Sequence, residues 1–240
     1  MPTSRRSPTK PRADAPLAAV HEQIVVCTRC ARLRDYCQRI ARDKKPAHRD
    51  EVYWGRPVPG FGDADARVLV IGLAPAAHGA NRTGRVFTGD GTGGSGDFLM
   101  RAMHAAGFAN IPTSRHPHDG LDLRDAFIAA AVRCAPPDNT PTTPEIAACH
   151  PHLVAEANAL PRVRVIVALG RLAFDSAWRL LAGRGLIVRP RPAFAHNAAY
   201  AAGGYTVIAS YHPSRQNTNT GKLTAEMMAA VFARARGALT

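Results

Sequence analysis

Four short apolar runs constrain the fold of this chain more than any other feature of its sequence. Each is rich in Val, Ile, Leu or Ala and has no polar alternation, which is typical of strands buried on both faces. The runs span residues 67–72, 127–133, 163–170 and 205–210. The alanines of the second run leave a buried helix open as an alternative there. Segments with helical spacing precede, separate and follow the runs: 18–42, 95–106, 144–160 (capped by Thr143), 171–181 and 224–237.

Strands that alternate with helices predict an α/β fold in which helices cover both faces of a parallel sheet. Ligands of such folds bind beyond the carboxyl ends of the strands. The loops that follow Gly72, Arg133 and Ser210 all leave such ends. We therefore expect the functional residues of this protein to lie in these three loops.

The length of 240 residues and the hydrophobic content of 46% suit a single well-cored domain, which we place at residues 17–240. Residues 1–16 are polar and basic with scattered prolines, so we expect a disordered arm there. No apolar run approaches the ~20 residues of a membrane helix. The N-terminus also has no apolar stretch that would act as a secretory core. We expect a cytoplasmic protein with no membrane partner.

The chain carries a net charge of +13, with 31 Lys and Arg against 18 Asp and Glu. Such an excess attracts polyanions, because contacts to phosphates release condensed counterions. An arginine-rich proteome would give the same bias, and the high Ala, Arg and Pro content is in keeping with that alternative. The charge indicates a nucleic-acid partner without specifying which one.

Four of the five cysteines have a spacing typical of a metal site. Cys27 and Cys30 form a Cys-x2-Cys pair, and Cys134 and Cys149 would supply the other two ligands. Zinc and a [4Fe–4S] cluster both accept four thiolates. The wide second spacing favours iron–sulfur, although His150 would allow a Cys3His zinc site. We interpret the fifth, Cys37, as a small buried apolar residue.

The loop after the first run contains six glycines between residues 84 and 96, which would let the backbone approach a ligand closely. Its Gly-x-Gly-x-x-Gly at 89–94 lies too far beyond the strand to bind a dinucleotide, and no Walker lysine follows. Asp90 is a candidate general base, or a charge that offsets a developing cation. Phe87 is a candidate stacking surface for a flat ligand. A solvated turn aspartate and a core phenylalanine are the alternatives.

The loop after the last run is polar and rich in hydrogen-bond donors. His212 is its candidate acid or electrophilic donor, although a lone histidine is more often structural. Four residues that follow it are suited to contacts with DNA phosphates: Ser214, Arg215, Gln216 and Asn217.

Taken in order, these motifs resemble the uracil-DNA glycosylase superfamily, and most closely its family 5, the type B enzymes. The motifs that carry the resemblance are Cys27-x2-Cys30, residues 72–76 with 79–90, residues 134–139 with Cys149, and residues 212–217. They extend the resemblance over roughly residues 20–235. Four long motifs in the same order are far more specific than any one of them.

The resemblance implies a three-layer α/β/α sandwich around a four-stranded parallel sheet, with a [4Fe–4S] cluster on Cys27, Cys30, Cys134 and Cys149. It also implies a monofunctional hydrolase that flips damaged bases out of double-stranded DNA and cleaves the N-glycosidic bond. Uracil, hypoxanthine, xanthine and ethenocytosine are the expected bases, and base excision repair the expected process. We expect a monomer associated with the nucleoid.

Other families of this superfamily place an acidic or amide residue beside the glycine of the first motif, whereas this chain has Leu73 and Ala74. The resemblance therefore moves catalysis to Asp90, which would position water or stabilise a cationic sugar. His212 would donate to uracil O2 as the base leaves. The remaining roles that we expect are base reading by Asn139, base stacking by Phe87, substrate binding by Gly72 and Ala74, and a phosphate clamp at Ser95.

Two alternatives remain on the sequence alone. The first is a non-catalytic DNA-binding module in which the metal cluster acts as a sensor. The second is a covalent relative that captures an abasic sugar through its histidine. Such relatives carry an inserted basic segment near the glycine-rich loop, and this chain has no such insertion.

Overall fold

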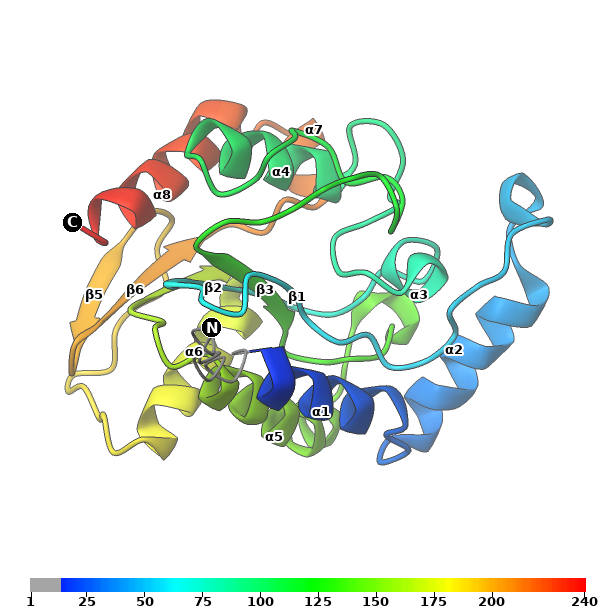
Figure 1. Ribbon diagram of the computed structural model, residues 1–240, viewed down its shortest axis with the longest axis horizontal. Helices are drawn as coiled ribbons and strands as arrows, with labels where there is room; N and C mark the ends of the chain where they lie inside the picture. The colour runs from blue at the N-terminus through cyan, green and yellow to red at the C-terminus, as the bar shows by residue number, and fades with distance from the viewer. Residues whose placement is uncertain (1–13) are drawn as a thin grey trace, which may run out of the picture.

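The computed structural model describes residues 14–240, and Figure 1 shows how its helices and strands are arranged. Its elements in chain order are α1 (Asp14–Val25), α2 (Ala31–Asp43), the 3-10 turn η1 (Pro46–His48), β1 (Phe61–Gly62), β2 (Val68–Gly72), α3 (Ala80–Thr83), α4 (Ser95–Ala105), β3 (Ala126–Ala130), the 3-10 turn η2 (Pro137–Asn139), α5 (Thr143–Ala159), β4 (Val165–Leu169), α6 (Arg171–Gly183), β5 (Ala199–Ala202), β6 (Tyr205–Ser210), α7 (Arg215–Asn219) and α8 (Ala225–Gly237). None of the described helices has both the length and the apolar composition that crossing a membrane requires.

The expected arm at residues 1–16 lies mostly outside the described residues. Helix α1 begins at Asp14, so the last three residues of that segment are helical. The remainder, residues 1–13, is not described.

The sheet has six strands in the order β1-β3-β2-β4-β6-β5. The four central strands are parallel, which confirms the four predicted runs as strands. The two edge strands are antiparallel, so the sheet is mixed rather than purely parallel as we expected. Sequence pattern did not find them because β1 has only two residues and β5 is a short, largely exposed strand.

Helices cover both faces of the sheet, as Figure 1 shows, with α4 and α8 on one face and α1, α5 and α6 on the other. Alternate residues of β2 explain why its sequence is apolar throughout. Val68 and Val70 pack in the same core as the buried residues of α4 and α8. Leu69 and Ile71 point the opposite way, into the core beside α5 and α6. The three-layer α/β/α arrangement is thereby confirmed.

The expected continuous helix over residues 18–42 is wrong, because the chain turns a corner between α1 and α2. The backbone N–H of Cys27 donates to Ile24 O at 3.1 Å and ends the first helix, and Cys30 precedes the second in an extended conformation. The corner places the first cysteine pair on a turn between two helices.

Helix α5 is capped by Thr142 rather than by Thr143 as predicted. The hydroxyl of Thr142 accepts from the N–H of Glu145 at 3.4 Å, and the Glu145 carboxylate accepts from the N–H of Thr142 at 2.7 Å. The same carboxylate accepts two hydrogen bonds from Arg32 of α2, at 2.8 and 2.7 Å. This reciprocal cap therefore also ties α2 to the start of α5.

Candidate active site and cysteine pocket

The loops after β2 and β6 meet at the carboxyl ends of the central strands and bring Phe87 and His212 together. Their ring centroids lie 5.9 Å apart at an interplanar angle of 30°. The Phe87 ring lies directly over Gly72, where an added Cβ would approach Cε2 to 2.7 Å. A residue with a side chain at position 72 would collide with the aromatic ring, so only glycine lets the Phe87 ring pack on the end of the strand.

The Asp90 carboxylate is enclosed by glycine backbone. A Cβ on Gly79 would lie 2.0 Å from its Oδ1, and one on Gly94 would lie 2.6 Å from its Cβ. Burial raises the pKa of Asp90, and the charge of Arg215 is the largest effect that lowers it. Nη2 of Arg215 also donates to the backbone oxygen of Asp90 at 2.8 Å. The site therefore holds a carboxylate with raised proton affinity beside an anchored cation.

His212 is fixed in a neutral state by its surroundings. Burial lowers the pKa of His212 to about 4, so its imidazole is uncharged at pH 7. The backbone packs close beside it, since a Cβ on Gly170 would lie 3.3 Å from the Cβ of His212. The side-chain amide of Asn217 donates to His212 O at 2.8 Å and holds the loop. A neutral imidazole carries one N–H, which suits it to donate a hydrogen bond.

The four residues predicted to contact DNA divide into two pairs. Ser214 Oγ caps helix α7 by accepting from the N–H of Asn217 at 3.4 Å, and the Asn217 amide is used on His212. These two shape the loop from within. Arg215 and Gln216 are exposed. Ser95 opens helix α4 as predicted and is half-buried there.

Two further predicted substrate contacts, Asn139 and Ala74, follow the ends of β3 and β2. Asn139 is exposed at the end of the turn after β3, with φ at +54°, and its side chain makes no hydrogen bond within residues 14–240. Ala74 packs against the buried group that contains Cys134 and Cys149. Ala74 therefore contributes to the wall between the loop after β2 and the cysteines.

Sequence reasoning missed two buried arginines that hold the glycine-rich loop. Arg82 pairs with Glu51, and its Nη2 donates to Gly89 O at 2.7 Å, immediately before Asp90. Arg85 donates to Thr88 Oγ1 at 2.8 Å, immediately after Phe87. Their exposed fractions are only 8% and 6%. Two arginines three residues apart in a glycine-rich loop are the signal that would have pointed to them.

The four predicted metal ligands line a single pocket. Cys27 and Cys30 come from the corner between α1 and α2, Cys134 follows β3, and Cys149 lies in α5. Cys37 does not line this pocket; its thiol donates to Ala135 O at 3.6 Å and is fully buried. The sequence had offered His150 as an alternative ligand, but the histidine that lines the pocket is His152.

Buried polar groups without partners surround these thiols. Nη2 of Arg133 lies 2.7 Å from Glu156 Oε2, whereas its Nε and Nη1 have no hydrogen-bond partner in residues 14–240 although the side chain is 1% exposed. The N–H of Arg133 donates to Cys149 Sγ at 3.2 Å. His152 Nε2 also lacks a partner there. Burial raises the pKa of Cys149 to about 12, and the charge of Arg133 opposes this. The pocket therefore contains four thiols and the buried guanidinium of Arg133.

The pocket does not have the geometry of a single-ion site. Within residues 14–240, no group of three or more His, Cys, Asp or Glu side chains is arranged to hold one metal ion. The donor set nevertheless fits a metal centre held by four cysteines. Four thiolates would bind it, and the main-chain N–H of Arg133 on Cys149 Sγ and the Arg133 guanidinium, which also pairs with Glu156, would offset part of their negative charge.

Comparison with known proteins decides the family. The sequence model of the Uracil DNA glycosylase superfamily matches residues 59–236. The chain belongs to the uracil-DNA glycosylase superfamily. The resemblance inferred from the four motifs is thereby confirmed.

Two relatives in this superfamily cover about nine tenths of the chain, and a more distant one covers 59% of it. A Type-5 uracil-DNA glycosylase of Thermus thermophilus is 49% identical over 216 residues, 90% of this chain and 94% of that protein. One from Mycobacterium leprae is 46% identical over 215 residues, 89% of this chain and 91% of that protein. A Type-4 uracil-DNA glycosylase of Pyrobaculum aerophilum is 32% identical over 143 residues, 59% of this chain and 62% of that protein.

Proposed function

We propose that this chain is a monofunctional uracil-DNA glycosylase that hydrolyses the N-glycosidic bond of uracil in double-stranded DNA, during base excision repair. One observation carries the proposal. An aromatic ring and a neutral histidine stack at the carboxyl edge of the sheet, and a glycine-enclosed carboxylate follows three residues after the ring, in a chain 46–49% identical to Type-5 uracil-DNA glycosylases.

Base release requires a surface that holds the flipped base, a donor to the leaving base and a group that stabilises the sugar. Phe87, His212 and Asp90 are suited to these three roles in turn. A uracil flipped out of the duplex would lie on the Phe87 ring, and the exposed Asn139 amide would read its Watson–Crick edge. Uracil leaves as an anion whose charge develops on O2. The N–H of neutral His212 would donate to that oxygen, and it would bind more strongly in the transition state than in the ground state. His212 thus acts as an electrophilic donor that needs no protonation.

Asp90 would complete the reaction on the sugar side. As the bond breaks, positive charge develops on the sugar, and a carboxylate stabilises it or orients the water that attacks C1′. The glycines around Asp90 leave room only for backbone and solvent, and Arg215 favours the ionised form that either role requires. Water then supplies the hydroxyl group of the abasic product, and the base takes up the proton that water loses.

We propose a base range that extends to hypoxanthine, xanthine and ethenocytosine. Stacking on Phe87 is indifferent to the identity of a flat ring, and Leu73 and Ala74 offer no polar group that would reject a different base edge. Flipping costs a few kcal/mol of stacking and pairing. The net charge of +13 would offset part of that cost through contacts to the DNA backbone.

The direct test incubates the protein with a duplex that contains one uracil, followed by alkali to break the strand at any abasic site. We expect strand breakage for the wild type and a loss of at least about a hundredfold in rate for His212→Ala. His104→Ala removes an exposed histidine at the far end of α4 and serves as the matched control with normal turnover. Intact strands at micromolar wild-type protein, with DNA still bound, would favour a non-catalytic binding module and overturn the proposal.

We further propose that Cys27, Cys30, Cys134 and Cys149 hold a [4Fe–4S] cluster, with zinc as the alternative. Four thiolates on one zinc ion would lie about 3.8 Å from one another, given Zn–S bonds of ~2.3 Å. All four thiols line one pocket, and the wide sequence spacing of Cys134 and Cys149 favours the cluster over zinc. The buried charge of Arg133 would offset the negative charge of four thiolates. When bound, the cluster supplies a cross-link through four iron–sulfur bonds.

A further inference from the structure

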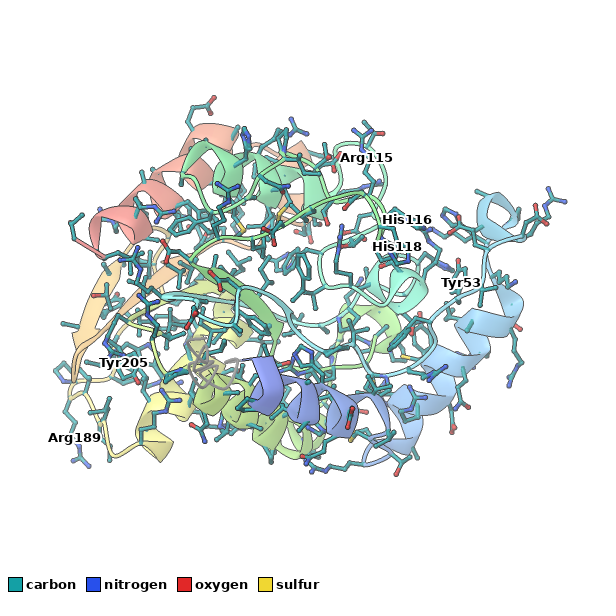
Figure 2. All side chains as sticks on the ribbon, in the orientation of Figure 1. Tyr53, Arg115, His116, His118, Arg189 and Tyr205 are labelled. Carbon is teal, nitrogen blue, oxygen red and sulfur yellow. The ribbon has the colours of Figure 1, made fainter. Side chains whose placement is uncertain are left out.

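The loop between α4 and β3, residues 111–120, carries three exposed basic side chains that the proposed reaction does not use. They are Arg115, His116 and His118. Figure 2 shows them on the same side of the molecule as α3, with Arg189 and Tyr205 at the opposite side. We call this segment the 111–120 loop.

The 111–120 loop is fastened to the turn that presents Phe87 and Asp90. The Ser114 hydroxyl hydrogen-bonds with Thr88 Oγ1 at 2.7 Å, and Ser114 O accepts from the N–H of Gly89 at 3.1 Å. The Ser114 N–H donates to Asp97 Oδ1 at 3.1 Å, within the first turn of α4. Ser114 itself is 3% exposed. The loop therefore has a fixed position relative to the proposed catalytic residues.

An internal carboxylate sets the shape of the loop without leaving a net negative charge on its surface. Asp119 accepts from the N–H groups of Arg115 and His116, at 2.8 and 3.2 Å. It also accepts two hydrogen bonds from Nη2 of Arg85, both at 2.8 Å. Together these donors hold the pKa of Asp119 at about 2, so it is ionised and paired with Arg85. The exposed tip is left with the three basic side chains.

The donors at the tip are oriented before any ligand binds. Arg115 is held by Asp97, with its Nε and Nη2 both 3.3 Å from Oδ2, while 54% of its side chain stays exposed. His116 Nδ1 accepts from the N–H of His118 at 3.2 Å, which places its proton on Nε2. The two imidazole rings lie 5.4 Å apart. One guanidinium and two imidazoles thus form a compact donor group on a rigid support.

We infer that the 111–120 loop is a binding site for backbone phosphates of the DNA, on nucleotides that flank the base in the site. Half or more of protein–DNA hydrogen bonds go to the sugar–phosphate backbone, and they fix the register of the protein on the duplex. A rigid donor group binds phosphate with little loss of side-chain entropy. This inference rests on the proposed function, because it needs a DNA strand that enters beside Phe87 and Asp90.

The test measures binding by fluorescence anisotropy on a duplex that contains tetrahydrofuran, an abasic analogue that no glycosylase cleaves. We expect Arg115→Ala to lower the slope of log K against log salt by about one, as the loss of one phosphate contact should. His116→Ala with His118→Ala, and the triple variant, should raise Kd by about tenfold or more. Turnover of the triple variant should show a higher KM with kcat changed less than about threefold.

Arg189→Ala is the matched control, since it removes one exposed arginine from the opposite side of the molecule. We expect its Kd and salt slope to equal those of the wild type. The double histidine variant leaves the Arg115–Asp97 pair intact, so a loss in both variants reports lost DNA contacts rather than a loosened loop. The inference would be overturned if Arg115→Ala and the double histidine variant both kept the wild-type affinity and the wild-type slope of log K against log salt. A wild type that binds the tetrahydrofuran duplex but releases no base from a uracil-containing duplex would instead overturn the proposed function. The salt slopes of the variants would still decide whether the loop binds DNA.

Discussion

At the scale of single residues, the protonation of Asp90 depends on burial, which opposes its ionisation, and on nearby donors and cations that favour it. Burial raises its pKa, and Arg215 is the largest influence in the opposite direction. Gly79 and Gly94 pack directly against Asp90, since a Cβ added to either would collide with it. Arg215 thus has a second use besides the DNA contact that its exposure suggests.

Replacing Arg215 by Ala should shift the pH profile of base release. Removal of the cation raises the pKa of Asp90 further, and Asp90 must be ionised in either proposed role. The acid limb of kcat/KM should therefore move to higher pH, with a greater loss of activity on the acid side than above about pH 8. Arg215→Lys should restore part of the shift. Gln216→Ala is the uncharged neighbour for comparison, and an acid limb that coincides in all variants would rule out this control of Asp90.

The key residues of the site could be predicted where their chemistry is local. Phe87, Asp90 and His212 are each the single aromatic, carboxylate or imidazole in a loop that leaves a strand end. The partners that hold them could not be predicted, because they come from distant positions: Arg215 reaches Asp90 across 125 residues. The hydrogen bond from the Asn217 amide to His212 O could not be predicted either, because only the fold brings these two groups together.

At the scale of elements, the 111–120 loop depends on the ion pair between Asp119 and Arg85. The pair is largely buried, with exposed fractions of 15% and 7% for the two side chains. Arg85 also stacks over Phe61 of the edge strand β1, 5.0 Å from its ring centroid. A two-residue strand, a surface loop and the glycine-rich turn are therefore joined through one guanidinium.

Asp119→Asn should lower the free energy of unfolding by about 1–3 kcal/mol at pH 7, the range for charged hydrogen bonds of this kind. The folded pKa of Asp119 is about 2, below the ~3.9 of an unfolded chain. Its contribution is therefore complete above about pH 4 and is lost as the pH falls through about 2. Urea unfolding at a series of pH values should show the difference from the wild type shrinking over that interval. Asp122→Asn, at an exposed neighbour that lies outside the ion pair with Arg85, is the matched control.

The central strands and most helices could be predicted because burial on both faces leaves an unambiguous apolar run. The edge strands could not, since β1 owes its existence to a backbone register with β3 rather than to a pattern of its own. The break between α1 and α2 was missed for a similar reason. Apolar spacing continues across the corner, and only the fold reveals that the cysteines there face the end of β3.

At the scale of the whole molecule, the cysteine pocket connects the N-terminal helices to the central sheet. Its walls come from α2, the end of β3 and α5, which are far apart in sequence. The buried Arg133–Glu156 pair adjoins it, and Glu156 also accepts from the N–H of Gly60 at 2.7 Å. A group bound in the pocket would stabilise the packing of all three segments at once.

The cluster proposal predicts that protein purified without air contains iron and absorbs broadly in the visible range. Cys149→Ala should lose the iron and unfold at a lower temperature, because the cross-link between α5 and the α1–α2 corner is gone. Cys37→Ala is the matched control: it removes a buried cysteine that does not line the pocket and should keep the iron. A colourless protein that carries one zinc ion would contradict the cluster and support the alternative.

The hydrogen bonds from Ser114 to Thr88 and Gly89 join the loop that would grip the strand to the turn that would act on the base. The loop and the turn would therefore meet DNA in a fixed position relative to each other. The rate of base flipping would then depend on how often the base leaves the DNA helix by itself. Uracil opposite guanine leaves more easily than uracil paired with adenine. A protein with this fixed arrangement would remove uracil opposite guanine, which arises from deaminated cytosine, faster than uracil misincorporated opposite adenine.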